Sequence, residues 1–329
     1  MNTRGFVLTA MNTIPSTFNE NQIDITVIGG NQILISKLPI SVILLNRSGT
    51  TFRVNNLEAL SSYGFADIVC VEAPQQNYNL DELSKRFPYV KFLIPGKNLT
   101  TGEMINLGMS EVRNKKVLVL WDTMHLSTKI ISERILSILL KEDVLCHVPF
   151  LFTEQMQTLP AKNVPSIEKG TFSVKTFTVT QDFAKTLYPF DFIGVYDKER
   201  FINLGGFDYT LSSNYWQLLD FALRSYLWGE KIEICSGLRL NYECEVPLEN
   251  TTPDASYLRF FLKNLCPKFL EDYAYIPKKE FFYYLNRSSL GFFKAYKTFK
   301  MARNWVSKNK FRFKTDAQTL ITAWDSEDE

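Results

Sequence analysis

Short apolar runs alternate along the chain with stretches whose apolar residues recur every three or four positions. The runs have the length and composition of buried strands, and they occupy residues 40–45, 67–71, 90–94, 117–121 and 144–148. The helix-spaced stretches fill the intervals; one opens with a Thr100–Glu103 capping-box pattern and another at Ser127. This alternation predicts an α/β fold, in which helices cover both faces of a mostly parallel sheet.

The two ends of the chain depart from this alternation. Within residues 1–38, apolar stretches at 23–28 and 33–35 flank a Gly-Gly-Asn turn, a pattern typical of a β-hairpin. We expect an accessory hairpin there and assign it no function. The α/β domain is then expected over residues 39–245, and a helical extension rich in aromatic and basic residues over 246–329.

Polar side chains stand directly after three of the predicted strands, namely Asn46, Glu72 and Asp122. The carboxyl ends of parallel strands share one edge of the sheet, which is where open α/β sheets bind ligands. A carboxylate at that edge can hold a divalent cation, and the cation a diphosphate. Considered by itself, Asp122 is more simply explained as the N-cap of the next helix.

Composition excludes several classes of protein. The 329 residues are 45% hydrophobic and 22% charged, as in an ordinary globular protein, and a net charge of +2 gives no general attraction for nucleic acid. The five cysteines have no paired spacing and there are two histidines, so we expect buried reduced thiols and no zinc site. The N-terminus is a poor signal peptide, and the apolar runs are shorter than the ~18 residues that span a bilayer, so we expect a cytoplasmic protein.

Two further motifs lie in the second half of the chain. Residues Gly205 to Asp208 form a Gly-Gly-Phe-Asp sequence, and a helix expected from Asn214 ends at Gly229. Asp220 and Arg224 are four positions apart on that helix, a spacing that favours an ion pair.

Together these segments resemble family 2 glycosyltransferases of the GT-A fold, over roughly residues 40–235. Four pieces carry the resemblance, in the family's order. They are the first strand at 41–45; the strand at 67–72 that ends in an acid; the Asn106-Leu107-Gly108 helix followed by the strand into Asp122; and the Gly-Gly-Phe-Asp loop followed by the helix of Asp220 and Arg224.

The resemblance implies that an acceptor hydroxyl attacks the anomeric carbon of a nucleotide-sugar in a single inverting displacement, while a carboxylate base takes the proton. It assigns nucleotide-sugar binding to Asn46, Glu72, Asn106 and Asp122, a metal contact (Mg²⁺ or Mn²⁺) to Asp122, and the acceptor side to Gly206, Phe207 and Trp216. The acceptor is expected to be a glycan or a lipid-linked glycan.

Two positions depart from the family pattern. Met124 stands where a second metal-binding acid is expected, and a thioether is a poor ligand for Mg²⁺ or Mn²⁺, so any metal site is weak. Leu218 stands at the usual position of the base and cannot accept a proton. Asp220 and Asp208 are the replacement candidates, with Asp191 as a third; for Asp220, an ion pair with Arg224 is an equally good explanation.

The last third of the chain combines aromatic with basic residues. Residues 251–314 contain 14 Lys and Arg against 4 Asp and Glu. Packing between helices is the commoner role of such aromatic residues. The alternative is contact with an anionic membrane surface, which would place the protein at the inner face of a membrane. No recognised motif supports nucleic-acid binding.

Two functions are therefore compatible with the sequence. The first is a glycosyltransferase that uses a nucleotide-sugar. The second is a catalytically impaired protein of the same fold that binds a nucleotide-sugar or glycan, or acts as a scaffold, because the substitutions at Met124 and Leu218 remove expected chemistry.

Overall fold

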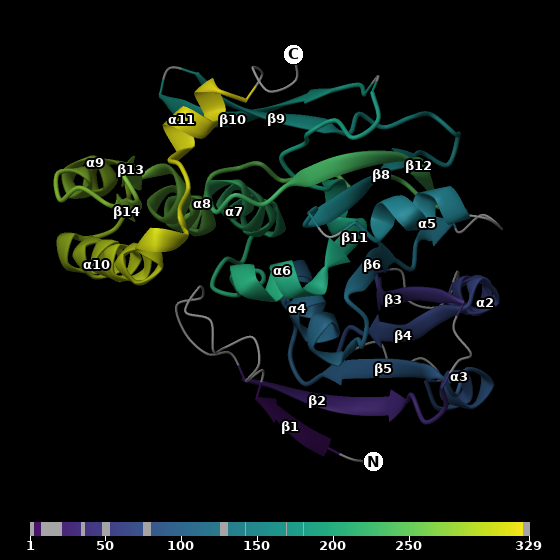
Figure 1. The fold of residues 1–329 in the computed structure, drawn as a ribbon. Coiled ribbons are helices and arrows are strands. Elements are labelled where there is room, and N and C mark those ends of the chain that lie inside the picture. The colour runs from purple at the N-terminus through teal and green to yellow at the C-terminus, as the bar shows by residue number, and fades with distance from the viewer. Residues whose placement is uncertain are drawn as a thin grey trace.

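The computed structural model describes residues 3–7, 22–33, 37–47, 53–74, 80–125, 131–141, 143–168, 170–179 and 181–324. A ten-stranded mixed sheet forms its centre (Figure 1), in the order β1-β2-β5-β4-β3-β6-β11-β8-β12-β7. The strands are β1 (Thr3–Val7), β2 (Gln22–Gly29), β3 (Leu38–Leu45), β4 (Phe65–Val71), β5 (Val90–Pro95), β6 (Lys116–Trp121), β7 (Met124–His125), β8 (Cys146–Phe152), β11 (Gly194–Asp197) and β12 (Ile232–Tyr242).

The predicted α/β fold is confirmed in the first half of the chain. Strands β5, β4, β3 and β6 are mutually parallel, and their apolar side chains are almost entirely buried. Right-handed crossovers place α2 (Arg53–Tyr63) and α3 (Leu80–Arg86) on one face and α4 (Thr101–Glu111) on the other. The Thr100–Glu103 capping box is formed at the start of α4. Gly108 lets α4 approach the sheet, since a Cβ there would lie 2.8 Å from Ile43.

The second half of the sheet is mixed. Strand β11 inserts antiparallel between β6 and β8, and β8 is parallel to β12. The helices here are α5 (Glu133–Leu139), the 3₁₀ turn η1 (Phe190–Phe192), α6 (Lys198–Leu204) and α7 (Asn214–Leu227), and β9 (Lys162–Glu168) pairs with β10 (Thr171–Phe177). Helix α5 begins after an N-cap at Ser132; the predicted start at Ser127 lies outside the described residues.

The predicted N-terminal hairpin is not formed as expected. Strand β2 pairs with β1 on one side and β5 on the other, so both of its edges are occupied and it joins the central sheet. Ile33 belongs to no strand, and the rest of the predicted partner stretch, Leu34 and Ile35, lies outside the described residues.

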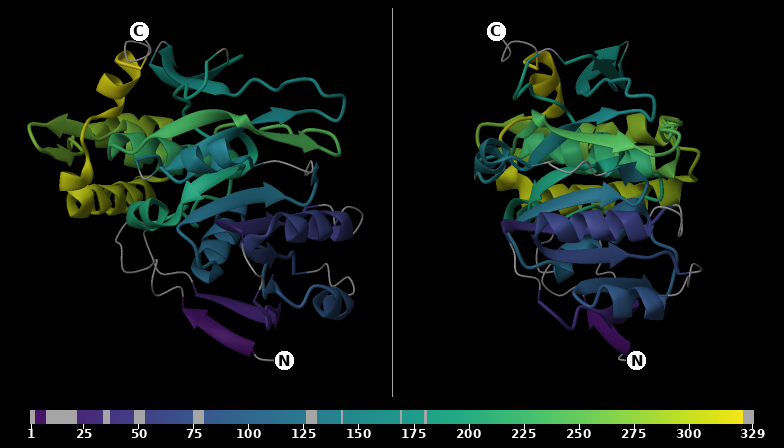
Figure 2. Two further views of the ribbon diagram at one scale, coloured as in Figure 1. Left: turned by 45° about the vertical axis from the view of Figure 1, so that its right-hand side comes forward. Right: turned by 90° about the vertical axis from the view of Figure 1, so that its right-hand side faces the viewer.

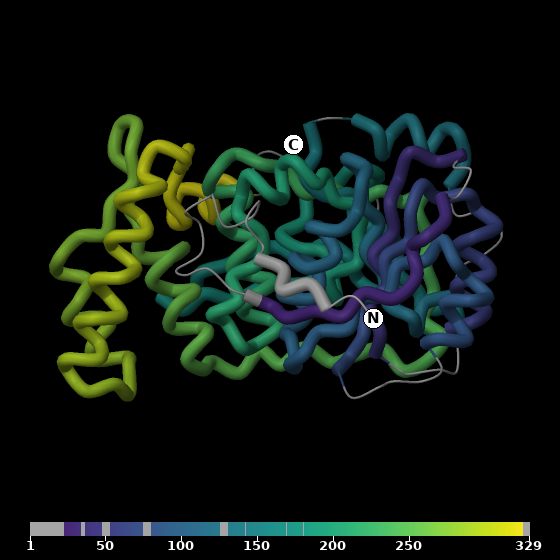
Figure 3. Tube along the Cα trace, turned by 90° about the horizontal axis from the view of Figure 1, so that it is seen from below, coloured from purple at the N-terminus to yellow at the C-terminus, as the bar shows by residue number. Residues whose placement is uncertain are grey.

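The C-terminal residues form helices that pack against α7 and extend from one end of the molecule. They are α8 (Ala255–Phe260), the π-helical turn η2 (Phe261–Leu265), α9 (Glu280–Arg287), α10 (Phe292–Asn309), the turn η3 (Lys310–Arg312) and α11 (Ala317–Thr322), with a small β13 (Lys268–Leu270)–β14 (Tyr273–Tyr275) pair. Helices α9 and α10 lie side by side at the end remote from α2 and α3 (Figures 2 and 3). Within the described ranges, no helix is both long and apolar enough to cross a bilayer.

Candidate functional site

The three polar residues that follow strands meet at one edge of the sheet, as predicted. The Asn46 Nδ2 atom donates to Glu72 Oε2 at 2.7 Å, and the backbone N–H of Arg47 donates to Asp122 Oδ1 at 2.9 Å. The meeting follows from topology, because β4, β3 and β6 are adjacent parallel strands.

The two acids of this edge are, however, engaged by the protein itself. Glu72 is fully buried and forms an ion pair with Arg53, which is 2% exposed. Burial lowers the pKa of Arg53, although nearby Asp122 acts in the opposite direction. Asp122 is 1% exposed, and its backbone carbonyl accepts from Asn56 at 2.6 Å. Arg53, in the first turn of α2, was not among the predicted site residues.

Met124 and His125, the described side chains that follow Asp122, do not complete a divalent-cation site with it. Among the described residues there is no cluster of three His, Cys, Asp or Glu side chains that could hold a metal. Met124 is fully buried, and His125 lies at 3.0 Å from Glu243 at the exposed β7–β12 edge. A carboxylate whose oxygen already accepts a backbone N–H offers a hard cation little of the oxygen ligation that it requires.

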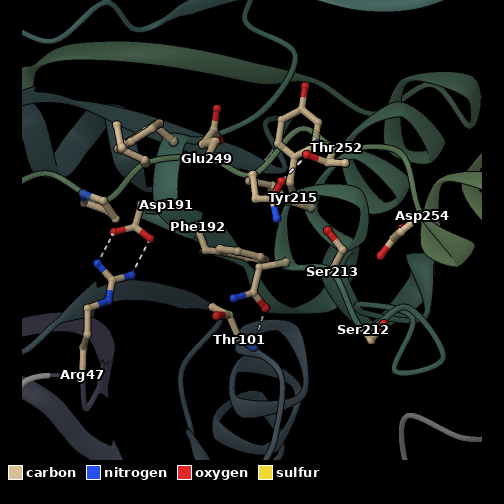
Figure 4. Close-up of a pocket in the computed structure, with 16 residues that line it drawn as sticks. Arg47, Thr101, Asp191, Phe192, Ser212, Ser213, Tyr215, Glu249, Thr252 and Asp254 are labelled. Atoms are coloured by element: carbon tan, nitrogen blue, oxygen red, sulfur yellow. Dashed lines mark hydrogen bonds and ion pairs between the residues drawn. The ribbon is translucent and has the colours of Figure 1, made fainter.

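Next to this edge, Arg47 and Asp191 form a two-point ion pair (Figure 4). Arg47 Nη1 and Nη2 lie 3.0 and 2.6 Å from the two Asp191 carboxylate oxygens. The guanidinium also lies over the Trp121 ring, at 3.8 Å from its centroid, and the Trp121 Nε1–H donates to the Asp191 carbonyl at 3.0 Å. A further donor, Tyr242, reaches Asp191 Oδ2 at 3.0 Å. Both carboxylate oxygens of Asp191 are therefore occupied.

The backbone at this ion pair is strained. Asp191 and Phe192 both have positive φ angles, 53° and 64°, which side-chain-bearing residues adopt at a cost of about 1–3 kcal/mol each. Such strain persists only where surrounding contacts hold it. Here the bonds from Arg47, Trp121 and Tyr242 hold Asp191, and Phe192 packs on Phe207.

The Arg47–Asp191 pair forms one wall of a pocket of about 490 Å³. The first residues of α4 and of α7 line a second wall, and residues 247–254, which follow β12, line the third. Leu218, which the resemblance places at the position of the base, belongs to this lining. The pocket therefore lies beside the predicted donor edge and includes the position where an acceptor hydroxyl is expected to react.

Glu249 is the acid in the pocket with the most unusual electrostatics. Burial raises the pKa of Glu249 to about 7, against a bond from Tyr188 that acts to lower it. That bond runs from the Tyr188 hydroxyl to Glu249 Oε2 at 2.9 Å, and Tyr188 is itself 2% exposed. No motif marks Glu249 in the sequence, because it lies in an irregular segment; only the spatial placement singles it out.

Asp208 and Asp220, the predicted catalytic acids, lie elsewhere. Both are fully buried, and Lys263 Nζ bridges them at 2.8 Å from an oxygen of each. Asp220 also pairs with Arg224 at 3.2 Å, as its spacing predicted, and accepts from Asn264 at 2.7 Å. Burial alone would raise the pKa of Asp208, but Lys263 lowers it below its ordinary value. Neither acid lines the pocket, so these contacts favour a structural role.

Helix α4 holds the Gly-Gly-Phe-Asp loop in place through the side chain of Asn106. The Asn106 side chain donates to the Phe207 carbonyl at 2.8 Å and accepts from the Phe207 N–H at 2.9 Å. A Cβ on Gly206, which has φ +66°, would lie 2.5 Å from Asn106 Oδ1. Phe207 is fully buried, and Trp216 is 4% exposed with its Nε1–H bonded to the Thr252 carbonyl at 3.0 Å. The loop thus shapes the wall behind the pocket.

Of the predicted residues, Asn46, Glu72 and Asp122 are brought together at the strand edge, and Asn106, Gly206 and Phe207 are brought together behind the pocket. Asp191 was predicted only as a further candidate base, and four residues of these sites were not predicted from the sequence: Arg47, Arg53, Lys263 and Glu249.

No protein-family model matches the chain, and no curated protein matches it in sequence. The structure is similar to the crystal structure of GalNAc-T7 with UDP, GalNAc and Mn²⁺, with a TM-score of 0.61 and 12% identity over 90% of this chain. This chain spans 57% of the length of that one. A weaker similarity, with a TM-score of 0.47 and 12% identity, is found to the crystal structure of S. aureus TarS 1-349, and it covers 81% of this chain and 71% of that one. The likeness establishes a GT-A-like α/β fold of the kind found in glycosyltransferases.

Proposed function

We propose that this protein transfers a glycosyl group from a nucleotide-sugar donor to a hydroxyl of a glycan or lipid-linked glycan. The observation that carries the proposal is the pocket that adjoins the carboxyl edge of the parallel strands and is lined by Glu249, Arg47 and the former base position, Leu218. The GT-A-like fold supports it, because GalNAc-T7, of similar fold, was crystallised with UDP.

In this proposal Glu249 takes the proton that the family base would take. The acceptor oxygen bonds to the anomeric carbon, the bond from that carbon to the diphosphate breaks, and the hydroxyl proton passes to Glu249. A carboxylate with a pKa of about 7 is well matched to general-base work near neutral pH. The pocket has two other acids. Asp191 has both oxygens bonded, to Arg47 and Tyr242, and Asp254 accepts from Ser256 and Tyr257 as the N-cap of α8.

Arg47 has the complementary role at the leaving group. Its side chain is about one-third exposed and lines the pocket, and its backbone N–H donates to Asp122. A cation held in place by Trp121 and Asp191 stabilises the negative charge that develops on a departing diphosphate. In this proposal Arg47 offsets the charge of the leaving group, since the described residues include no group of three metal-binding side chains.

Two measurements test the proposal. A nucleoside diphosphate, drawn from a panel of bases, should raise the free energy of unfolding by roughly 1–3 kcal/mol at saturation, and Arg47→Gln should remove most of that shift. Glu249→Gln should keep the nucleotide shift and lower kcat by about 10²–10⁴ with any accepted donor, while Glu245→Gln, an exposed acid nearby, should leave kcat unchanged.

The outcomes separate the two parts of the proposal. If no nucleotide stabilises the protein and no donor is consumed, with or without Mn²⁺, the transferase activity is refuted. If transfer occurs and Glu249→Gln is fully active, the activity stands and the assignment of the base does not.

A second candidate is a catalytically impaired protein that binds a nucleotide-sugar or glycan, or acts as a scaffold. The observation that favours it is the engagement of Glu72 by Arg53 and of Asp208 and Asp220 by Lys263. This candidate predicts a nucleotide or glycan shift without turnover, with the same shift in Glu249→Gln.

A further inference from the structure

The aromatic residues of the C-terminal extension divide into two sets. Phe281, Phe299 and Trp305 are buried and pack between helices, which is the common role that the sequence analysis favoured. A second set remains outside. Phe293 is 86% exposed, Phe282 67%, Phe292 54% and Tyr296 51%.

These four exposed rings form one contiguous patch. The ring centroids of Phe282, Phe292 and Tyr296 lie 5.7, 5.5 and 5.8 Å from that of Phe281, which is buried beneath them. Phe293 joins the patch through Phe292, at 5.8 Å. Large rings gathered in water carry an unfavourable solvation cost, so such a patch marks an interaction site.

Basic side chains border the patch. Lys294, Lys297 and Lys300 are exposed on α10, and no ion pair is formed by any of the three with the described residues. Residues 278–314 contain 11 Lys and Arg against one acid, Glu280. We call the four exposed rings and these three lysines the aromatic–basic face.

We propose that the aromatic–basic face docks the protein on an anionic lipid bilayer. Aromatic rings at the end of a helix enter the headgroup region, while lysines along the same helix meet anionic headgroups. Helices α9 and α10 lie at one end of the molecule, apart from the central sheet (Figure 3), and the four rings of the face are exposed to solvent. The surface does not depend on the proposed transfer activity, since it lies outside the pocket.

Charge and ring geometry favour a bilayer over other occupants. In a two-fold dimer the same face would meet itself and bring like-charged lysines together. For nucleic acid, rings must offer free faces to stack on bases. Here the rings meet edge to face, with interplanar angles of 87° and 89° between Phe281 and Phe292 or Tyr296 and of 89° between Phe292 and Phe293, so they do not offer the row of parallel faces on which successive bases stack.

The test is flotation of the full chain with vesicles of phosphatidylcholine alone or with 30 mol% phosphatidylglycerol. We expect binding to the anionic vesicles only, weakened by salt. The triple variant K294Q/K297Q/K300Q should bind about 100-fold more weakly, from about 1 kcal/mol for each lysine. F282S/F293S should bind at least tenfold more weakly even at low salt.

A matched control variant removes three positive charges from other parts of the surface. K37Q/K85Q/K231Q replaces three exposed lysines that lie outside α9, α10 and the aromatic–basic face, and this variant should keep its binding. All variants change exposed side chains, and circular dichroism checks that they fold. The proposal is overturned by equal binding to neutral vesicles, by an equal loss in the control, by binding to single-stranded oligonucleotide in place of vesicles, or by a dimer that F282S/F293S dissociates.

Discussion

Replacing Lys263 with methionine would show whether Asp208 and Asp220 serve the structure or the chemistry. The four charged groups of this buried cluster balance, with Asp208 and Asp220 against Arg224 and Lys263. All are at most 1% exposed. The change leaves one uncompensated buried negative charge, which costs about 3–5 kcal/mol in comparable buried pairs.

The assay is urea unfolding followed by fluorescence and circular dichroism. Lys263→Met should lose about 3–5 kcal/mol, and Lys85→Met, at an exposed position, less than ~0.5 kcal/mol. Adding Asp208→Asn to Lys263→Met restores neutrality with Asp220 and Arg224 still paired, so the double variant should regain more than ~1.5 kcal/mol.

The pH dependence of stability gives an independent test of the structural role of this cluster. Lys263 holds the pKa of Asp208 in the folded protein below its ordinary value. The ionised Asp208 therefore stabilises the fold at pH values above the pKa of an unfolded Asp, and this stabilisation is lost as the pH falls through the pKa of Asp208 in the folded protein. In Lys263→Met, burial without the cation raises the pKa of Asp208, so lowering the pH protonates this carboxylate and removes the uncompensated buried charge. The difference in the free energy of unfolding between wild type and Lys263→Met should therefore decrease as the pH falls from 7 to 4. A loss below ~1 kcal/mol at pH 7, or no recovery on adding Asp208→Asn, would refute the structural role.

Two other predictions follow from the site. Gly206→Ala should destabilise the fold by roughly 1–3 kcal/mol more than Gly170→Ala in thermal unfolding, because both have positive φ but only Gly206 has a close neighbour, Asn106 Oδ1 at 2.5 Å; equal losses would contradict this. For wild type, kcat/KM should rise with pH through an apparent pKa of about 7, because Glu249 must lose its proton to act as base. Glu249→Gln should abolish that rise, and a retained rise would point to another group.

Much of the first half of the fold could be predicted from local pattern. Strands β3 to β6 are apolar runs separated by capped or glycine-ended helices, and parallel pairing of neighbours then places Asn46, Glu72 and Asp122 at one edge. The N-terminal hairpin was mispredicted because the period-2 pattern of β2 specifies a strand but not its partners.

The site itself could not be predicted in the same way, because its contacts join distant segments. Arg47 meets Asp191 across 144 positions, and Lys263 meets Asp208 across 55. Neither partner has a local signature: Lys263 lies in a π-helical turn within an apolar sequence, and Asp191 adopts a left-handed backbone conformation that no glycine or turn motif marks in the sequence. Only the tertiary packing selects these pairs.

The internal partners of the acids decide what the edge can do. A donor nucleotide that approached Glu72 would have to displace Arg53, and the buried cation would then be left without its partner, at a cost of several kcal/mol. Arg47 is about one-third exposed, and its ion pair with Asp191 uses two of the five guanidinium N–H groups, so it can donate to a diphosphate while it stays paired with Asp191. Arg47 is therefore better placed than the buried Glu72 to bind a diphosphate in the proposed reaction. Because Arg47 and Glu249 both line the pocket, the proposed reaction is centred in the pocket and not at the strand edge.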